Sequence, residues 1–251
     1  MLTGLIMQER LQKIIANKGL CSRREAERWI LEGRVKVDGQ LASIGQKVDM
    51  EKQDVVVNGK SINRLSPEKI VIAVHKPRGF TCTNDDPYAE KLVFELLPKH
   101  HQRLKLFVAG RLDKDSSGLV IITNDGSFAQ KLTHPSHEIE KRYRVRIKPG
   151  LERKDVSWFL QGQIDEGETL QFDRIDFPTK GAEPYEELDV ILSHGKKREI
   201  RRLFKKSRRD VKRLKRLSIG RLNLKGLTIG ACKELTPKEI ESLLAAPGER
   251  R

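Results

Sequence analysis

The densest cluster of residues that could do chemistry lies at residues 109–119, which read AGRLDKDSSGL. Two carboxylates, Asp113 and Asp115, stand here among small and polar residues, between two apolar segments. This pattern indicates a strand, a polar loop and a second strand, so the carboxylates would project at the edge of a sheet. A carboxylate in such a loop can act as a nucleophile, accept a proton or bind a metal.

Calcium binding is the first alternative for this loop. Asp113, Asp115, Ser117 and Gly118 occupy positions 1, 3, 5 and 6 of an EF-hand loop. That loop also needs a bidentate glutamate at position 12, where this chain has Asn124, and it needs flanking helices rather than strands. The residues therefore disfavour a calcium site.

Other metal and cofactor signatures are weak or missing in the sequence. His134 and His137 are three residues apart, but Pro135 breaks the helix that would bring them together. Cysteines occur far apart, at positions 21, 82 and 232, so no CxxC pair could hold zinc or a redox disulfide. No phosphate loop or GxGxxG element is present. We therefore expect no metal and no cofactor.

Short strands, with fewer helices, would position the central loop. Apolar runs predict strands at 70–74, 104–108, 119–122, 143–147 and 188–192. The spacing of Ile200, Leu203 and Phe204 suits one face of a helix, and the sequence TPKE at 236–239 is a typical helix start. Many strands with fewer helices predict an α+β domain.

The first 64 residues predict a small separate module. A helix around Leu11–Ile15 is closed by Gly19, and Ser22 with Glu25 forms a capping box for a second helix over 23–31. A strand at 35–37 and turns at 38–39 and 58–59 follow. The polar connector 63–68 separates this module from the rest, so we expect domains at 8–65 and 69–247.

The charge of the chain is unevenly distributed. The whole protein has 251 residues and a formal net charge of +15. Residues 196–216 contain 13 basic and 2 acidic side chains, whereas residues 150–190 contain 4 basic and 11 acidic ones. Such segregation is typical of a protein that binds nucleic acid, with the acidic stretch facing away from the polyanion.

The sequence also indicates a cytoplasmic protein. No apolar run approaches the roughly 20 residues of a membrane-spanning helix, so we expect no membrane association. The first residues, with Met1 and Met7 as alternative starts, do not resemble a secretory signal. The scattered cysteines agree with a reducing compartment.

The N-terminal module resembles the S4 RNA-binding domain over nearly all of residues 8–60. The resemblance is carried by LQKIIA at 11–16, GLCSRREA at 19–26 and the segment from Ile30 to Gly39, which includes GRVKVDG at 33–39. It implies that Ser22, Arg23, Arg24 and Lys36 contact RNA. Capping of the second helix by Ser22 is compatible with that role.

The rest of the chain resembles pseudouridine synthases, in particular the ribosomal, RsuA-type branch. The element GRLDxxSxGL at 110–119 looks like the active-site motif of that group. Further matching segments occur in the family's order at 76–79, 124–126, 132–136, 141–145 and 195–203. The resemblance implies a small S4 module followed by a catalytic domain with a mixed, mostly antiparallel sheet flanked by helices.

The same resemblance assigns roles to individual residues. Asp113 matches the essential aspartate, Arg201 the arginine that pairs with it, and Tyr143 the active-site tyrosine. Arg111 would order the loop or fill the gap left by the target uridine, and Leu203 or Ile200 would pack against the base. The remaining residues expected to bind the substrate or RNA are Lys76, Arg198 and Arg202.

The resemblance implies a monomeric, cofactor-free enzyme that isomerises a uridine in ribosomal RNA. Motif details and length favour 23S RNA of the large subunit over 16S RNA, and either free RNA or a ribosomal assembly particle could be the substrate. One alternative is a non-catalytic S4-type ribosome assembly factor, which the intact set of Asp113, Tyr143 and Arg201 argues against. A DNA-binding regulator is a third class, disfavoured because no dimerisation feature is seen.

Overall fold

The computed structural model describes residues 8–84 and 89–245. These residues form two compact units, one made of 8–69 with 100–106 and the other of 70–99 with 107–245. The alternative start residues Met1 and Met7 and the predicted domain end at 247 lie outside the described residues. Within those residues, the structure contains no helix with the length and apolar character needed to cross a membrane.

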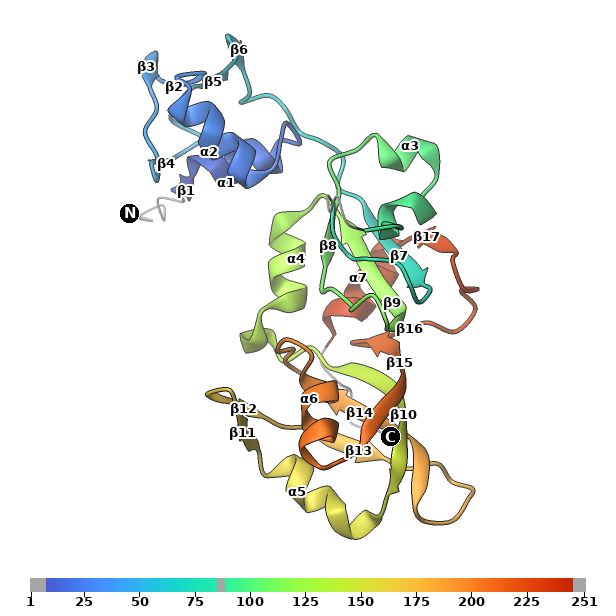
Figure 1. The fold of residues 1–251 in the computed structure, drawn as a ribbon. Coiled ribbons are helices and arrows are strands. Elements are labelled where there is room, and N and C mark those ends of the chain that lie inside the picture. The colour runs from blue at the N-terminus through green and yellow to red at the C-terminus, as the bar shows by residue number, and fades with distance from the viewer. Residues whose placement is uncertain (1–7, 85–88, 246–251) are drawn as a thin grey trace, which may run out of the picture. The chain divides into compact units, whose positions relative to one another are not determined.

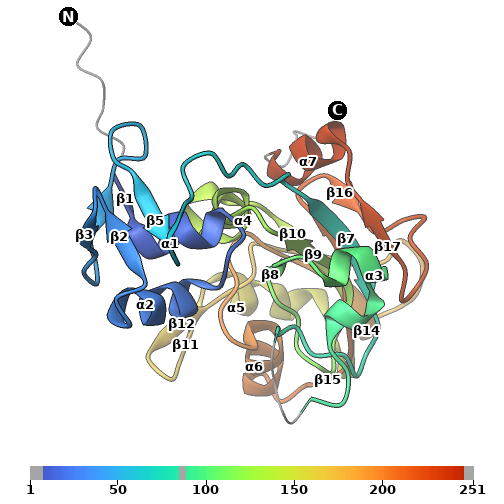
Figure 2. The ribbon, with the colours of Figure 1, turned by 90° about the horizontal axis from the view of Figure 1, so that it is seen from above.

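The first unit combines two helices with short strands. Its two helices lie side by side in both ribbon views (Figure 1, Figure 2). The strands form a sheet of order β3-β2-β5-β6 and a separate pair, β1-β4. The elements are β1 (Glu9–Arg10), α1 (Leu11–Asn17), α2 (Arg23–Leu31), β2 (Val35–Val37), β3 (Gln40–Leu41), β4 (Lys47–Val48), β5 (Val55–Val57) and β6 (Lys60–Ser61).

Local sequence determines the start of α2 and the core of this unit. The Ser22 hydroxyl accepts a hydrogen bond from the Glu25 amide at 3.2 Å, which caps the helix as expected. Apolar side chains from both helices and from β2, β4 and β5 form one buried cluster. The predicted helix at 23–31 and strand at 35–37 are confirmed.

The second unit contains a large mixed sheet. Its strand order is β13-β14-β10-β15-β9-β7-β17, with β16 paired to β15 and β8 to β9. All pairs are antiparallel except β9 with β15, so the predicted mixed, mostly antiparallel sheet is confirmed. The strands are β7 (Val71–Lys76), β8 (Phe107–Ala109), β9 (Ser117–Thr123), β10 (Lys141–Leu151), β13 (Arg174–Asp176), β14 (Tyr185–Leu192), β15 (Asp210–Ile219), β16 (Leu222–Asn223) and β17 (Cys232–Glu234).

Helices and a hairpin accompany this sheet. They are α4 (Gly126–Thr133), α5 (Val156–Leu160), α6 (Glu199–Lys206), α7 (Pro237–Leu244) and the hairpin of β11 (Gln163–Asp165) and β12 (Glu168–Leu170). A short helix, α3 (Lys99–Gln102), lies where the chain passes between the two units. Single 3-10 turns occur at Val93–Leu96, Pro135–His137 and Arg153–Asp155. The helices α4 and α7 pack on β7, β8 and β9 through one buried cluster. Stacked and tilted rings join Phe159, Phe172 and Phe204 near α5 and α6.

The structure adds a strand to one predicted segment and shifts another. The basic segment 196–216 is a helix only as far as Lys206, and after a turn with Arg208 in the left-handed region it continues as β15. Along this strand Leu214 and Arg216 are buried, Lys212 and Arg213 are exposed, and Lys215 between the two buried residues is half-buried. The strand expected at 104–108 lies instead at Phe107–Ala109, since Leu104 forms a turn with His101 and is exposed.

The parallel contact between β9 and β15 leaves no room for a side chain at Gly118. This residue pairs with Arg216, and its φ of +117° lies in the region that favours glycine. A Cβ placed there would lie 2.3 Å from the carbonyl oxygen of Arg216 and 2.5 Å from its nitrogen. The approach of the two backbones therefore requires glycine at position 118.

We predict that Gly118→Ala lowers the free energy of unfolding by about 3 kcal/mol or more, because both φ and the neighbouring backbone oppose a Cβ. Urea denaturation measures this loss. The matched control is Gly167→Ala, where φ is also positive but nothing lies within 4 Å, and there the loss should be about 1–2 kcal/mol. Equal losses in the two variants would contradict the steric explanation.

Candidate active site

The loop between β8 and β9 presents two carboxylates. Gly110, with φ of +83°, begins the loop, and Leu112 anchors it by burying its side chain. The Ser116 amide donates to the Asp113 carbonyl at 3.1 Å, which closes a tight turn. The side chains of Asp113 and Asp115 are both partly exposed. Asp113 can therefore meet a ligand from solvent, whereas the Oδ1 atom of Asp115 is buried.

Arginines from α6 and the residue before it face these carboxylates. Arg198 Nη1 lies 3.3 Å from Asp113 Oδ2 and 3.7 Å from Asp115 Oδ1. Arg201 Nη2 lies 3.0 Å from Asp115 Oδ2, whereas Arg201 Nε is 4.0 Å from Asp113 Oδ2. The structure thus brings Arg201 to Asp113, as the resemblance implies, but Arg198 makes the shorter contact. Two guanidinium groups stabilise the negative charge of Asp113.

Hydrogen bonds to the backbone and to Ser116 fix the position of Arg201. Its Nη2 also donates to the Asp115 carbonyl at 3.3 Å and to the Ser116 hydroxyl at 3.2 Å, and its Nη1 donates to the Val211 carbonyl at 3.3 Å. Burial lowers the pKa of this guanidinium, and Asp115 is the largest influence in the opposite direction. The buried Nε atom has no hydrogen-bond partner and is the atom nearest Asp113. It is a donor available to a shifted carboxylate or to a ligand.

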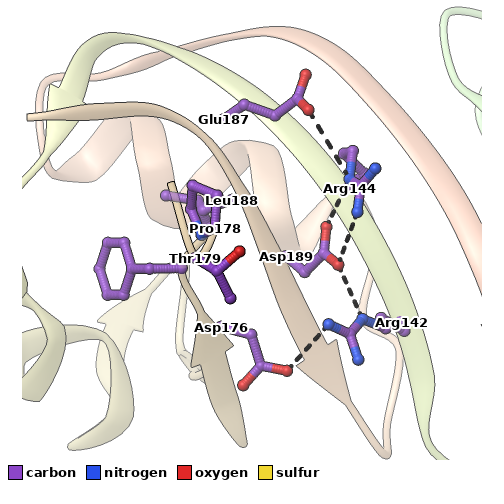
Figure 3. A pocket seen from close by; sticks show the side chains of 9 residues that line it. Arg142, Arg144, Asp176, Pro178, Thr179, Glu187, Leu188 and Asp189 are labelled. Carbon is purple, nitrogen blue, oxygen red and sulfur yellow. Dashed lines mark hydrogen bonds and ion pairs between the residues drawn. The ribbon is translucent and has the colours of Figure 1, made fainter. Parts of the chain in front are cut away.

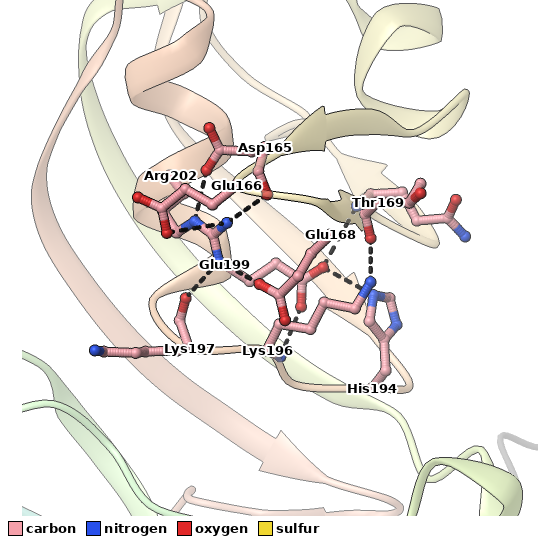
Figure 4. A network of polar contacts seen from close by, with 10 residues as sticks. Asp165, Glu166, Glu168, Thr169, His194, Lys196, Lys197, Glu199 and Arg202 are labelled. Atoms are coloured by element: carbon pink, nitrogen blue, oxygen red, sulfur yellow. Dashed lines mark hydrogen bonds and ion pairs between the residues drawn. The ribbon is translucent and has the colours of Figure 1, made fainter.

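A buried glutamate shapes the segment that carries Arg198. Glu199 accepts hydrogen bonds from His194 Nε2 at 2.9 Å, from the Lys196 amide at 3.0 Å and from the Gln171 amide at 3.4 Å (Figure 4). The Lys196 ammonium donates to the Thr169 carbonyl. These contacts fold residues 194–199 into a turn in which Arg198 takes a φ of +52° just before α6.

Arg202, expected to bind RNA, is instead enclosed by acidic side chains. Its guanidinium donates to Asp165 at 2.6 Å and to Glu168 at 2.6 Å, both in the β11–β12 hairpin (Figure 4). These hydrogen bonds raise the pKa of Arg202. The structure therefore gives Arg202 the role of tying the hairpin to α6. It also corrects the expectation that the acidic stretch 150–190 faces away, because part of that stretch contacts the basic segment.

Two more of the expected substrate contacts are buried. Lys76 is 0% exposed, and its ammonium donates to the carbonyls of Pro77 at 3.0 Å, Phe80 at 2.8 Å and Lys114 at 3.5 Å. Burial lowers its pKa. Leu203 is also 0% exposed, in the core under α6. The structure thus assigns Lys76 to the support of the loop and Leu203 to the core, and not to a surface that meets RNA.

Tyr143 lies beside an arginine that the sequence reasoning did not single out. Tyr143 is 9% exposed on β10, and its hydroxyl accepts a hydrogen bond from Arg216 Nη1 at 3.5 Å. Arg216, directly opposite on β15, is 3% exposed. Its burial was hidden because it ends a run of basic residues. The signal that could have found it is the two-residue spacing from the apolar Leu214, which puts Arg216 on the same face of a strand.

The other expected residues are on the surface. Arg111 is exposed in the loop, two positions before Asp113. In the first unit, Ser22, Arg23 and Arg24 at the start of α2 and Lys36 in β2 are exposed. No ion pair involves Arg23, Arg24 or Lys36 within residues 8–84 and 89–245. These cations are accessible to a polyanion.

No metal cluster is found at this site among the described residues, and a hollow in the second unit lies elsewhere. In the part of the chain that the structure describes, no group of three His, Cys, Asp or Glu side chains could hold a metal ion. A hollow of about 290 Å³ lies at β10, β13 and β14 (Figure 3). Two arginines line it, and both form ion pairs with Asp189. Arg142 also pairs with Asp176, and Arg144 also pairs with Glu187. Their charges are already neutralised.

Known proteins are similar to both parts of this chain. A family model described as RNA pseudouridylate synthase matches residues 70–206, and an S4 domain model matches residues 9–56. The chain is 37% identical over 240 residues to "Ribosomal large subunit pseudouridine synthase B" of Bacillus subtilis, covering 94% of this chain and 96% of that protein. The protein of the same name from Yersinia pestis is 38% identical over 245 residues, covering 94% and 76%.

A solved structure is similar over the same extent. The crystal structure of a pseudouridylate synthase matches with a TM-score of 0.66 and 27% identity, covering 93% of this chain and 99% of that one. Both the sequence and the fold are therefore similar to those of pseudouridine synthases across nearly the whole chain.

We predict a pH-dependent contribution of His194 to stability. The hydrogen bond to Glu199 raises the pKa of His194, so this contribution is complete below about pH 6.5 and is lost as pH rises through the folded-state pKa. Burial opposes ionisation of Glu199, but hydrogen bonds from His194 and the Lys196 amide outweigh it and lower its pKa.

Urea denaturation of wild type and His194→Gln from about pH 6 to about pH 9 measures the effect. The advantage of wild type should shrink as pH rises, and Glu199→Gln should flatten the same curve. An advantage that stays constant over this range would contradict the pairing.

Proposed function

The chain belongs to the RNA pseudouridylate synthase family, and we propose that it converts a uridine of ribosomal RNA into pseudouridine. The observation that carries this proposal is the partly exposed carboxylate of Asp113, with Arg198 at 3.3 Å and Arg201 at 4.0 Å. An ionised carboxylate held between guanidinium groups in an accessible loop can act as a nucleophile or as a base.

The chemistry of the reaction explains why it can proceed without a cofactor. Uridine and pseudouridine are isomers: the N1–C1′ bond breaks, the uracil turns, a C5–C1′ bond forms, and the proton lost from C5 is balanced by one gained at N1. Asp113 would act on the target nucleotide, either by attacking the sugar or ring or by removing a sugar proton. The isomerisation has no net redox change and no hydrolysis, so its stoichiometry requires no cofactor.

Other residues at the site have roles that fit their positions. Tyr143, on the strand beside β15, would stack on the uracil or assist proton transfer. The exposed Arg111 would order the loop or fill the space that the target uridine leaves. Arg198 would bind the RNA substrate next to the carboxylate of Asp113. Extrusion of the nucleotide costs a few kcal/mol, which contacts between basic residues and phosphates can offset.

We assign RNA binding to residues 8–65 and catalysis to residues 69–247, the end of which lies outside the described residues. The exposed Ser22, Arg23, Arg24 and Lys36 would contact the RNA backbone. We favour large-subunit 23S RNA over 16S RNA. The reason is that relatives matching 94% of this chain are named as large-subunit pseudouridine synthases. We further propose that the protein acts as a monomer in the cytoplasm.

We predict that Asp113→Asn abolishes pseudouridine formation while RNA affinity changes little, because the amide keeps the shape and loses the charge. Pseudouridine mapping on rRNA incubated with each variant measures the activity, and filter binding measures the affinity. The matched control is Asp210→Asn, an exposed aspartate in β15 paired with Lys212, which should retain activity. Wild-type protein that binds rRNA and leaves every uridine unchanged would favour the non-catalytic assembly factor.

We also predict that Arg23→Glu with Arg24→Glu weakens rRNA binding and reduces its salt dependence. Each lost phosphate contact lowers the slope of log K against log salt by about 1. Binding measured at several salt concentrations gives this slope, with Lys52→Glu with Lys60→Glu as an exposed control pair of equal charge change. If both double variants lower the slope equally, α2 is not a preferred contact surface.

A further inference from the structure

Arg216 is a buried cation without a counter-ion. Its side chain is on β15 and 3% exposed, and it makes no ion pair with a carboxylate within residues 8–84 and 89–245. A charge removed from water is costly unless hydrogen bonds or an opposite charge compensate for it. Because no carboxylate of the described residues compensates for the lost hydration of Arg216, its hydrogen bonds must do so.

These contacts join two parts of the active site. Arg216 Nε donates to the Leu119 carbonyl at 2.7 Å, and Nη2 donates to the Gly110 carbonyl at 2.8 Å. The two carbonyls flank the loop that carries Asp113. The third nitrogen, Nη1, donates to the Tyr143 hydroxyl at 3.5 Å, and the guanidinium carbon is 5.9 Å from the centre of that ring. One planar group thus contacts both ends of the loop and the tyrosine of β10.

The backbone of Arg216 strengthens the same connection. It pairs with Gly118 at the end of the loop, at a distance that excludes a Cβ. In β10 it pairs with Tyr143. Position 216 therefore lies between the two functional segments through both its main chain and its side chain.

The other basic side chains that hold the loop have narrower contacts. Lys76 bonds the Lys114 carbonyl, and Arg201 bonds the Asp115 carbonyl. Neither makes a hydrogen bond to Tyr143 within the described residues. Arg216 is thus the cation that relates the aspartate loop to the tyrosine in the part of the chain that the structure describes.

We propose that Arg216 is a positioning residue of the reaction, which sets the Asp113 loop and the Tyr143 hydroxyl relative to each other through one guanidinium. A misplacement of about 1 Å can cost about 100-fold in rate, so rigid placement of two reacting groups from different strands has a direct kinetic value. This inference rests on the proposed function, because it is tested by the rate of pseudouridine formation.

Arginine has the geometry that this role needs. Its guanidinium presents five N–H donors in a fixed plane, whereas a lysine ammonium is a compact point charge on a flexible stem. Arg216→Lys keeps the charge but cannot span the carbonyls of Gly110 and Leu119 and the hydroxyl of Tyr143 together. Arg216→Met removes the charge at similar length. The two variants separate geometry from charge.

The experiment measures kcat and KM for pseudouridine formation on rRNA, together with RNA affinity and the melting temperature of each variant. The matched control is Arg213→Lys, on the same strand, because Arg213 is exposed and lies on the opposite face. We expect Arg216→Lys to melt within a few degrees of wild type, keep its RNA affinity and lose about 100-fold in kcat. Arg213→Lys should match wild type in kcat.

The outcomes separate this inference from the proposed function. Wild type without activity on rRNA would contradict the proposed function itself. Active wild type together with a folded, fully active Arg216→Lys or Arg216→Met would overturn the positioning role. Loss of activity in Arg216→Lys and Arg216→Met that only follows loss of folded protein would also overturn it, since the role would then be structural.

Discussion

The ion pairs of Asp113 and Asp115 can form only if distant parts of the chain are held in register. Asp113 and its nearest cation, Arg198, are 85 residues apart in sequence, and each is partly exposed, so their attraction alone is too weak to organise the fold. The connection is made by the sheet, in which β15 lies between β9 and β10. In this arrangement the start of α6 lies beside the loop that precedes β9. The site therefore depends on the close approach of two backbones at Gly118.

The immediate surroundings of the carboxylates are rich in positive charge. Lys76 and Arg216 are buried and bind backbone carbonyls, while Arg198 and Arg201 bind carboxylates. Carbonyl oxygens stabilise buried cations without neutralising them. The residual positive field of such groups acts over the whole loop, and the substrate class that we propose is a polyanion. Support of the loop and attraction of the ligand thus come from the same side chains.

The limits of sequence reasoning are clearest at individual residues. Helix α2 could be predicted to the residue because Ser22 and Glu25 are local signals, and the family motif led to Asp113 and its position beside Arg201. Arg202, Lys76 and Arg216 were different. Whether a basic side chain meets solvent, an acidic hairpin or a buried carbonyl is decided by tertiary packing, which its neighbours in sequence do not encode. The strand that follows α6 was not predicted either, because charge masked the change of period after Lys206.

Helix α6 has a consequence for the evolution of this chain. Its successive residues serve different surroundings: Arg201 faces the aspartate loop, Arg202 the acidic hairpin and Leu203 the core. Each residue advances an α-helix by about 100°, so one inserted residue would rotate the side chains that follow it out of these surroundings. A substitution in this helix disturbs one of these contacts, whereas a change of length disturbs several together. We therefore expect length variation among relatives to collect in the connecting loops and to be absent from α6.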